Sequence, residues 1–530
     1  MTLIFRGAAA AIATLLAISG GTAVAQKSGG ILRIYDPQSP GNVSLLEEPT
    51  LVAEMPMMGV FNNLIMFDQQ QKQVSLQSIV PDLATSWEWN EDGTELTFQL
   101  RRGVKWHDGK PFTAQDVKCS WELRLGTAPE KLRLNFQKSA LDNLAEVTAN
   151  GDWEVTFHLK RPQPAFPMLL ATGFAAVTPC HLSPAQLRQH PIGTGPFKFV
   201  EFKPNEAIRV KRNPDYWKPD RPYLDGIEYT IVRDPSTAVL SFIAGKFDMT
   251  FPYNLTVPLM KDVQGQMPQA ICEMTTTGVN RHLLVNYHQP PFENPELRRA
   301  MSLTLDRQAF VDILAQGQGE IGGVLQPPPE GLWGLSPEQL KQLPAHGPDV
   351  HANRAEGRQI MQKLGYGPGK PLKIKVTTRD WSIYRDPAVL LIDQLKHVYI
   401  DGELELVDTA QYFPKILRKD YTVALNLQTS GPDPDLILKV FYGCGASINW
   451  DGYCNPDVDK LIERQSLEGD PERRKPLLSA IERKLAEDDA RPIIFYAKGG
   501  TCRQPYVKGL TVMANGIFNG WRMEDVWLDR

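Results

Sequence analysis

Hydrophobic and polar residues alternate in two short segments within the first third of the chain. In "TELTFQLRRG", residues 94–103, every second residue of the core stretch is apolar, and "WEVTFHLKRP", residues 153–162, has the same pattern. A period of two is typical of a strand with one face in a core and the other in water. We therefore predict two strands of one sheet.

The rest of the chain divides into a β-rich part and a part in which helices alternate with strands. Residues 29–37 are predicted to form a strand, 190–232 a β-meander and 294–317 a pair of helices. Between about 353 and 427 three helical patterns alternate with three apolar strand patterns, the first of these helices starting near Arg354. This alternation predicts an α/β region with a partly parallel sheet.

Two loops of that region follow predicted strands, namely 378–386 ("TRDWSIYRD") and 428–435 ("QTSGPDPD"). Ligands of such sheets gather outside the carboxyl ends of the strands, where loops diverge and helix N-termini point inward. We therefore expect ligand-binding residues in these two loops.

The segment "WHDGKPF", residues 106–112, places His107, Asp108 and Lys110 close together after the first alternating strand. Its Asp-Gly pair favours a tight turn, because glycine tolerates the positive φ that such a reversal requires. Since no nucleophile or second carboxylate accompanies these residues, we interpret the segment as a solvated turn and not as a catalytic site.

Residues 1–25 have the features of a secretory signal peptide. Arg6 precedes an apolar run, and the small-residue triplet 23–25 precedes Gln26, the expected first residue of the mature chain. Glycines break the run before it reaches the length of a membrane span, no cysteine stands at the cut site for a lipid anchor, and no later stretch is apolar enough to span a bilayer. We expect a soluble, exported protein.

The composition indicates a folded chain with more than one core. Of 530 residues, 42% are hydrophobic and 22% charged, and removal of the signal peptide changes the net charge from −4 to −5. This mild acidity, with both signs scattered, argues against a nucleic-acid partner, which would require a concentrated basic face.

Six cysteines, an even number, suggest disulfides in an oxidising compartment. Cys444 and Cys454 form the pair that the sequence supports best, because "CGASINWDGYC" contains two glycines and an Asp-Gly turn that let a short loop close. The sequence does not decide the pairing of Cys119, Cys180, Cys272 and Cys502. No CxxC or HxxxH spacing accompanies the cysteines, so we expect no metal site and no cofactor.

Two motifs suggest enzymes but lack the required context. "GQGEIGG", residues 317–323, matches GxGxxG, yet a helical pattern precedes it and no helix follows. Asp433 and Asp435 resemble the paired acids of a glycoside hydrolase, but adjacent prolines favour a rigid charged loop. A secreted hydrolase that uses Asp433 remains the alternative of another class.

Four segments, in this order, resemble the family 5 extracellular solute-binding proteins, the oligopeptide- and dipeptide-binding components of ABC importers. These segments are residues 81–117, 191–217, 294–307 and 431–438. The resemblance implies an α/β fold of the two-lobed periplasmic binding protein type (type II, cluster C), with an additional domain inserted in the first lobe. It also implies a monomer that encloses its ligand between the lobes, docks transiently on a membrane permease and catalyses no reaction.

On this basis we expect the following division of the chain: 1–25 signal peptide; 26–58 lobe I, first part; 59–188 inserted domain; 189–277 lobe I, second part; 278–488 lobe II; 489–530 C-terminal return to lobe I.

In dipeptide-binding relatives a basic residue in the loop that corresponds to 378–386 holds the ligand carboxylate. Arg379 and Arg385 both qualify, and we prefer Arg379 because it follows the strand directly and its guanidinium fork suits a carboxylate. Trp381 and Tyr384 are expected to add flat apolar walls.

In peptide-binding relatives a carboxylate in the loop that corresponds to 428–435 holds the α-amino group of the ligand. Ser430 occupies that position here, and a neutral hydroxyl cannot supply the charge-assisted bond that favours an ammonium. Asp433 is a possible substitute. A peptide or peptide-like ligand is our first expectation, and the alternatives are an opine-like compound, an oligosaccharide or a metal chelate.

Overall fold

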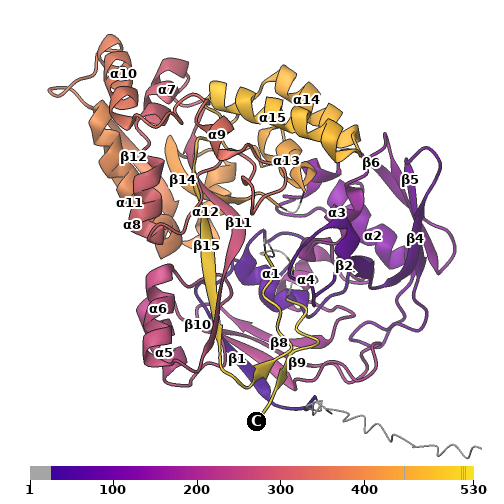
Figure 1. Cartoon of the computed structure of the whole chain (residues 1–530). Coiled ribbons are helices and arrows are strands. Elements are labelled where there is room, and N and C mark those ends of the chain that lie inside the picture. The colour runs from indigo at the N-terminus through magenta and orange to yellow at the C-terminus, as the bar shows by residue number, and fades with distance from the viewer. Residues whose placement is uncertain (1–25, 432, 447, 515, 517–518, 520) are drawn as a thin grey trace, which may run out of the picture.

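A computed structural model of the chain describes residues 26–530 except 432, 447, 515, 517, 518 and 520. The proposed signal peptide, residues 1–25, lies outside the described residues. Figure 1 shows three parts of the molecule, each built on a sheet of four or five strands. Two long strands run between the first and the third of these parts. Among the described residues, no helix combines the length and the apolar content that a bilayer crossing needs.

The first part contains a four-stranded sheet of order β1-β10-β9-β8. Its strands are β1 (Ile31–Asp36), β8 (Phe197–Lys203), β9 (Ala207–Arg212) and β10 (Gly226–Ile231). Its helices are α1 (Leu51–Met58), α5 (Pro235–Ile243) and α6 (Val257–Gln266). Strands β8, β9 and β10 pair antiparallel in sequence order, so the predicted meander is confirmed, and β1 adds in parallel to β10.

The second part is built on an antiparallel sheet of order β4-β5-β7-β6 with its own hydrophobic core. Its elements are β2 (Ile65–Phe67), β3 (Ile79–Pro81), β4 (Ala84–Trp89), β5 (Glu95–Leu100), α2 (Ala114–Leu125), β6 (Leu144–Ala149), β7 (Glu154–Leu159), α3 (Phe166–Leu170) and α4 (Pro184–Gln189). β5 and β7 are the two alternating segments, and they pair directly, as predicted.

The segment after β5 forms the predicted turn, and within it the side chain of His107 is only partly exposed. Gly109 has φ of 90°, and the Trp106 N–H donates to the Lys110 carbonyl over 2.8 Å. The His107 ring lies 3.0 Å from the Gly195 carbonyl oxygen, and burial lowers its pKa to about 4. Asp108, Gly109 and Lys110 are exposed, as predicted for a solvated turn, whereas the His107 ring packs against the neighbouring segment.

The third part is built on a five-stranded sheet of order β13-β12-β14-β11-β15. Its strands are β11 (Ile271–Val285), β12 (Leu372–Arg379), β13 (Ile400–Val407), β14 (Val423–Thr429) and β15 (Ile493–Arg503). Its helices are α7 (Pro295–Leu303), α8 (Arg307–Ala315), α9 (Pro337–Leu340), α10 (Val350–Lys363), α11 (Ser382–Leu395), α12 (Thr409–Leu417), α13 (Leu438–Tyr442), α14 (Pro456–Leu467) and α15 (Pro471–Glu487). β12 is parallel to β13 and β14, whereas β11 is antiparallel to β14 and β15, which confirms the partly parallel sheet.

Strands β11 and β15 extend from the five-stranded sheet towards the four-stranded sheet (Figure 1). Cys272 and Cys502 pair across these strands and form a disulfide. Next to this disulfide, the backbone of Met249 forms isolated β-bridges with Arg503 of β15 and with Ile34 of β1. The two long strands therefore connect the two parts of the molecule.

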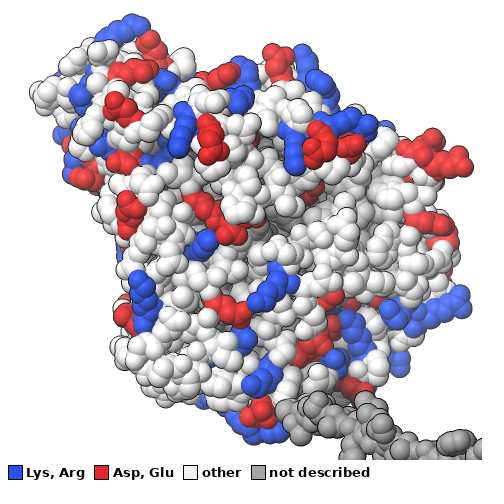
Figure 2. Space-filling model, in the orientation of Figure 1, with Lys and Arg blue, Asp and Glu red and all other residues white. Residues whose placement is uncertain are grey.

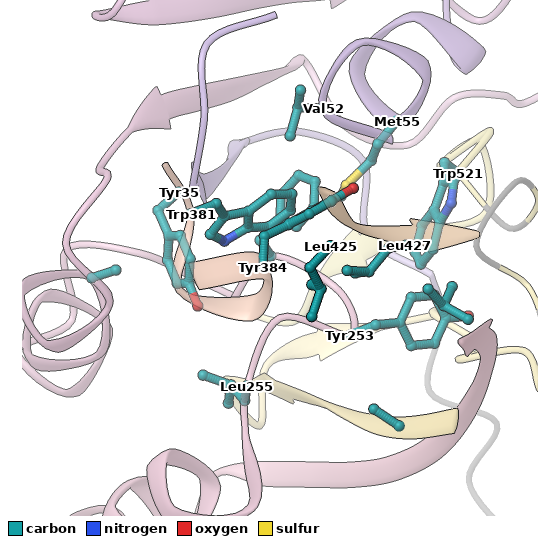
Figure 3. Packing of buried hydrophobic residues seen from close by; sticks show 14 of the residues in the cluster. Tyr35, Val52, Met55, Tyr253, Leu255, Trp381, Tyr384, Leu425, Leu427 and Trp521 are labelled. Atoms are coloured by element: carbon teal, nitrogen blue, oxygen red, sulfur yellow. The ribbon is translucent and has the colours of Figure 1, made fainter. Parts of the chain in front are cut away.

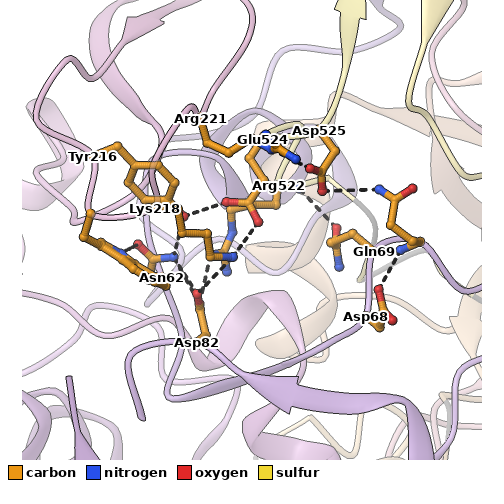
Figure 4. A network of polar contacts seen from close by, with 12 residues as sticks. Asn62, Asp68, Gln69, Asp82, Tyr216, Lys218, Arg221, Arg522, Glu524 and Asp525 are labelled. Carbon is orange, nitrogen blue, oxygen red and sulfur yellow. Dashed lines mark hydrogen bonds and ion pairs between the residues drawn. The ribbon is translucent and has the colours of Figure 1, made fainter. Parts of the chain in front are cut away.

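The C-terminal residues lie beside β1 and the second part. The short strands β16 (Val507–Lys508) and β17 (Trp527–Leu528) pair there. Figure 4 shows the polar network that holds this segment: Arg522 and Asp82, both fully buried, form an ion pair of 2.9 Å. Lys218 and Tyr216 bond to Glu524, each over 2.6 Å. The network ties the end of the chain to segments more than 300 residues away in sequence.

Candidate ligand-binding site

A cavity of about 280 Å³ lies where the three parts of the molecule meet. Its wall is mostly apolar and aromatic, and it is contributed by residues 49–52, 121–174, 251–281, 379–384, 413–450 and 497–498, with gaps. Figure 2 shows a hollow on the face between the same parts. A concave, apolar site with few polar groups is the usual form of a small-molecule site.

Trp381 and Tyr384 form one aromatic wall of the cavity. Their ring centroids are 5.9 Å apart, and Figure 3 shows both rings close to Val52 and Met55 of α1. The predicted loop 378–386 is in fact partly helical: α11 begins at Ser382, within that loop, and continues through Pro387. Because proline fixes a nearly helical φ, the helix can continue through it at the loss of one hydrogen bond. The helix start fixes both rings towards the cavity.

Arg379 ends β12 and lines the same wall, 3% exposed. It donates hydrogen bonds from Nη1 to the Tyr384 hydroxyl (2.9 Å) and from Nη2 to the Thr409 hydroxyl (3.1 Å). Both partners are neutral, and no carboxylate of the described residues is within ion-pair distance. The positive charge of Arg379 interacts with the Glu48 carboxyl group. However, burial raises the pKa of Glu48, which makes Glu48 a weaker counter-ion for Arg379. Among the described residues, the Arg379 guanidinium therefore donates only to neutral hydroxyl groups.

Arg281, in the middle of β11, also lines the cavity, and the sequence analysis did not identify it. It is 9% exposed, and among the described residues its side chain makes one hydrogen bond, from Nη1 to the Val279 carbonyl over 3.4 Å. Burial lowers its pKa to about 10, partly offset by the nearby Tyr384 phenol. A sequence signal existed, since Arg281 stands between the apolar residues Val279 and Leu283 on one face of the strand, but an arginine on an exposed strand face gives the same signal.

Lys498 is the third cation on the cavity wall, and unlike the arginines it is neutralised. Its ammonium lies 2.9 Å from Glu330 and 3.8 Å from Glu320. The described lining residues include no Asp and no Glu, and none of the six undescribed positions after residue 25 is acidic. The cavity wall thus carries an excess of positive charge.

Ser430 and Asp433, the other expected ligand-binding residues, are not among the described residues that line the cavity. The Ser430 N–H donates to the Gly278 carbonyl over 2.6 Å. Asp433 accepts two hydrogen bonds from Arg474, of 2.8 and 2.7 Å, in a buried pair. Asp435 is held by Gln163, Gln465 and Ser466.

This arrangement has two consequences. Asp433 cannot replace the carboxylate that would bind an ammonium, because its charge is already paired away from the cavity. For the same reason Asp433 and Asp435 do not flank a bond held in the cavity, as the acids of a glycosidase must.

The structure joins the cysteines as Cys119–Cys180, Cys272–Cys502 and Cys444–Cys454. Gly445 and Gly452 adopt φ of 70° and 81° within the short loop, as its closure requires. The described residues contain no group of three or more His, Cys, Asp or Glu that is placed to hold a metal ion.

Comparison with known proteins found a matching family model and related sequences. The model of "Bacterial extracellular solute-binding proteins, family 5 Middle" matches residues 78–449. Di/tripeptide-binding protein 1 of Pseudomonas aeruginosa (strain UCBPP-PA14) is 28% identical over 467 residues, which is 81% of this chain and 81% of the relative.

Two solved structures have a similar fold. The periplasmic binding protein DppA of Helicobacter pylori in complex with the peptide STSA has a TM-score of 0.83 at 20% identity, covering 95% of this chain and 99% of the other. The binding protein AgaA of A. tumefaciens R10 in complex with agropinic acid has a TM-score of 0.82 at 22% identity, covering 94% and 99%.

Proposed function

Because the chain belongs to the bacterial extracellular solute-binding proteins of family 5, we propose that it captures a peptide or peptide-like ligand for an ABC importer. It does so in the periplasm, after export by the cleaved signal peptide 1–25, and delivers the ligand to a membrane permease. The observation that carries the proposal is the cavity, because segments from all three parts of the molecule contribute to its wall.

We assign the parts as two lobes and an inserted domain. Lobe I consists of 26–58, 189–277 and 489–530, lobe II of 278–488, and the inserted domain of 59–188. Strands β11 and β15, which cross between the lobes, are then the hinge. Hinged closure over a ligand requires contacts between the lobes that exist only in the closed state.

A chain of buried hydrogen bonds provides such a contact. Arg379 donates to the Thr409 hydroxyl, and Thr409 donates to Gln38 Oε1 over 2.9 Å. Gln38 belongs to lobe I and the other two residues to lobe II. A ligand that binds Arg379 therefore stabilises a side chain that holds the lobes together, which couples binding to closure.

The experiment is native mass spectrometry of the protein purified from the periplasm, followed by release of any retained solute. A peptide or peptide-like solute, unchanged after prolonged incubation with the protein, is the expected result. If the retained solute is a sugar or a metal chelate, the proposed peptide ligand is wrong and that class of ligand takes its place. A cleaved product would contradict a binding function without turnover.

An opine-like or other non-peptide acid is the second candidate ligand. It is supported by the excess positive charge of the cavity wall, because the described residues that line the cavity include no Asp and no Glu. The complex of the structural neighbour AgaA with agropinic acid is consistent with such a ligand in this fold.

A further inference from the structure

We propose that the cavity selects ligands that carry a carboxylate and lack a free ammonium group, such as N-acylated amino acids or N-acylated peptides, and that Arg281 is an anion-binding residue. This inference rests on the proposed binding function and specifies the chemical class of the ligand.

The first argument is the state of Arg281. Its guanidinium carries five N–H donors, of which one makes a long hydrogen bond to a backbone carbonyl. The side chain is nine-tenths buried, and among the described residues it has no ion-pair partner. A buried cation without an anion is unfavourable, so a site that retains one is prepared for an anion from outside.

The second argument is that Arg281 and Arg379 act on the same space. Arg379 lies at the end of β12 and Arg281 on β11, and these strands flank β14 in the sheet. The Tyr384 phenol accepts a hydrogen bond from Arg379 and lies close enough to Arg281 to interact with its charge. Two guanidinium groups that form no ion pair with the described residues therefore face one cavity, and they favour a carboxylate over a neutral group.

The third argument concerns the other end of the ligand. The ammonium of a free peptide needs a carboxylate or several acceptors in a desolvated site. Here Ser430 is neutral, Asp433 is paired with Arg474, and the glutamates near the wall at residues 320 and 330 already bind Lys498. An acyl group in place of the ammonium removes both the unsatisfied charge and the repulsion from the arginines.

The fourth argument concerns the body of the ligand. The cavity wall presents aromatic side chains from each part of the molecule, including Phe174, Tyr253, Trp381 and Phe441. Such a wall stabilises flat or branched apolar groups by burial. The occupant is therefore an apolar acid and not a sugar-like polyol.

The test uses isothermal titration calorimetry with four probes on protein freed of retained solute by reversible unfolding with its disulfides intact. The probes are N-acetyl-Leu-Phe, free Leu-Phe, N-acetyl-Leu-Phe amide and 3-phenylpropanoate. We expect N-acetyl-Leu-Phe to bind at least tenfold more tightly than Leu-Phe and than the amide. Arg281→Met should weaken binding of the N-acetylated acid by roughly 10- to 100-fold and leave the amide nearly unaffected.

Arg307→Met is the matched control. Arg307 is also a buried arginine whose pKa burial lowers to about 10, but it bonds to backbone carbonyls outside the cavity. Its replacement should leave the affinity for N-acetyl-Leu-Phe unchanged. Arg281→Lys keeps a positive charge and should recover part of the affinity that Arg281→Met loses. Such a recovery would exclude misfolding as the cause of the weaker binding.

The outcomes separate this inference from the proposed function. If Leu-Phe binds as tightly as its N-acetylated form, or the amide as tightly as the acid, the inference is wrong and the peptide-binding function stands. If 3-phenylpropanoate binds and no peptide probe does, the charge preference stands and the peptide ligand is wrong. Absence of binding by all four probes would overturn both.

Discussion

Replacement of Thr409 by valine tests whether the hydrogen-bond chain through Thr409 couples ligand binding to closure. Valine has nearly the shape of threonine, and residue 409 is the first residue of α12, so the change removes a hydroxyl and little else. The lost bonds are Arg379 Nη2 to Thr409, within lobe II, and Thr409 to Gln38, between the lobes.

The two bonds contribute differently to closure. The bond from Arg379 lies within one lobe and is available in both the open and the closed state, so its loss changes closure little. The bond to Gln38 exists only when the lobes meet, and its loss leaves a buried amide oxygen without a donor. Removing one partner of a buried neutral hydrogen bond costs about 1–2 kcal/mol. If the open state prevails without ligand, the affinity falls by roughly 5- to 30-fold.

The assay is calorimetric titration of Thr409→Val with the solute that co-purifies with the wild type, combined with small-angle scattering of the saturated protein. Thr409→Ser keeps the hydroxyl and is the matched control, with an expected affinity within about twofold of the wild type. If Thr409→Val binds as tightly as Thr409→Ser, or if both lose affinity equally, the hydroxyl does not couple binding to closure.

Three further predictions concern stability. Because burial lowers the pKa of His107 to about 4, below its unfolded value near 6.5, its stabilising contribution is present above pH 6.5 and is lost as the pH falls towards 4. Between pH 7 and pH 5 the wild type should lose about 1–2 kcal/mol more than His107→Gln in urea unfolding, and equal losses would contradict this. Arg522→Met leaves the Asp82 carboxylate buried without its main partner and should lower the free energy of unfolding by about 3 kcal/mol, whereas an unchanged melting temperature would show that the pair contributes nothing net. Serine replacement of both Cys272 and Cys502, which are 230 residues apart, should lower the free energy of unfolding by about 5 kcal/mol. The same replacement of Cys444 and Cys454, which are 10 residues apart, should lower it by about 3 kcal/mol. If the second variant had the lower denaturation midpoint, the chain entropy of the unfolded state would not explain the two effects.

Local pattern was sufficient to predict much of the fold. The alternating segments became β5 and β7, the meander became β8 to β10, and the helix–strand alternation produced the partly parallel sheet. The pairing of Cys444 with Cys454 followed from a ten-residue loop with glycines. The sequence also pointed to Arg379, Trp381 and Tyr384, which lie within six residues at the end of one strand. The structure places all three in the cavity wall, and their role in binding stays a prediction.

The rest depended on contacts between segments that are distant in sequence. Arg281 reaches the cavity because β14 pairs between β12 and β11, and no spacing along the chain encodes that order. Asp433 appeared available until the fold placed Arg474 beside it, and Ser430 follows a strand whose neighbouring residues face the cavity while it does not. Strand pairing, lobe contacts and burial depend on the free energy of the whole chain and not on local pattern. Local sequence therefore determined which helices and strands form. Only the tertiary structure decided which charges remain unpaired for a ligand.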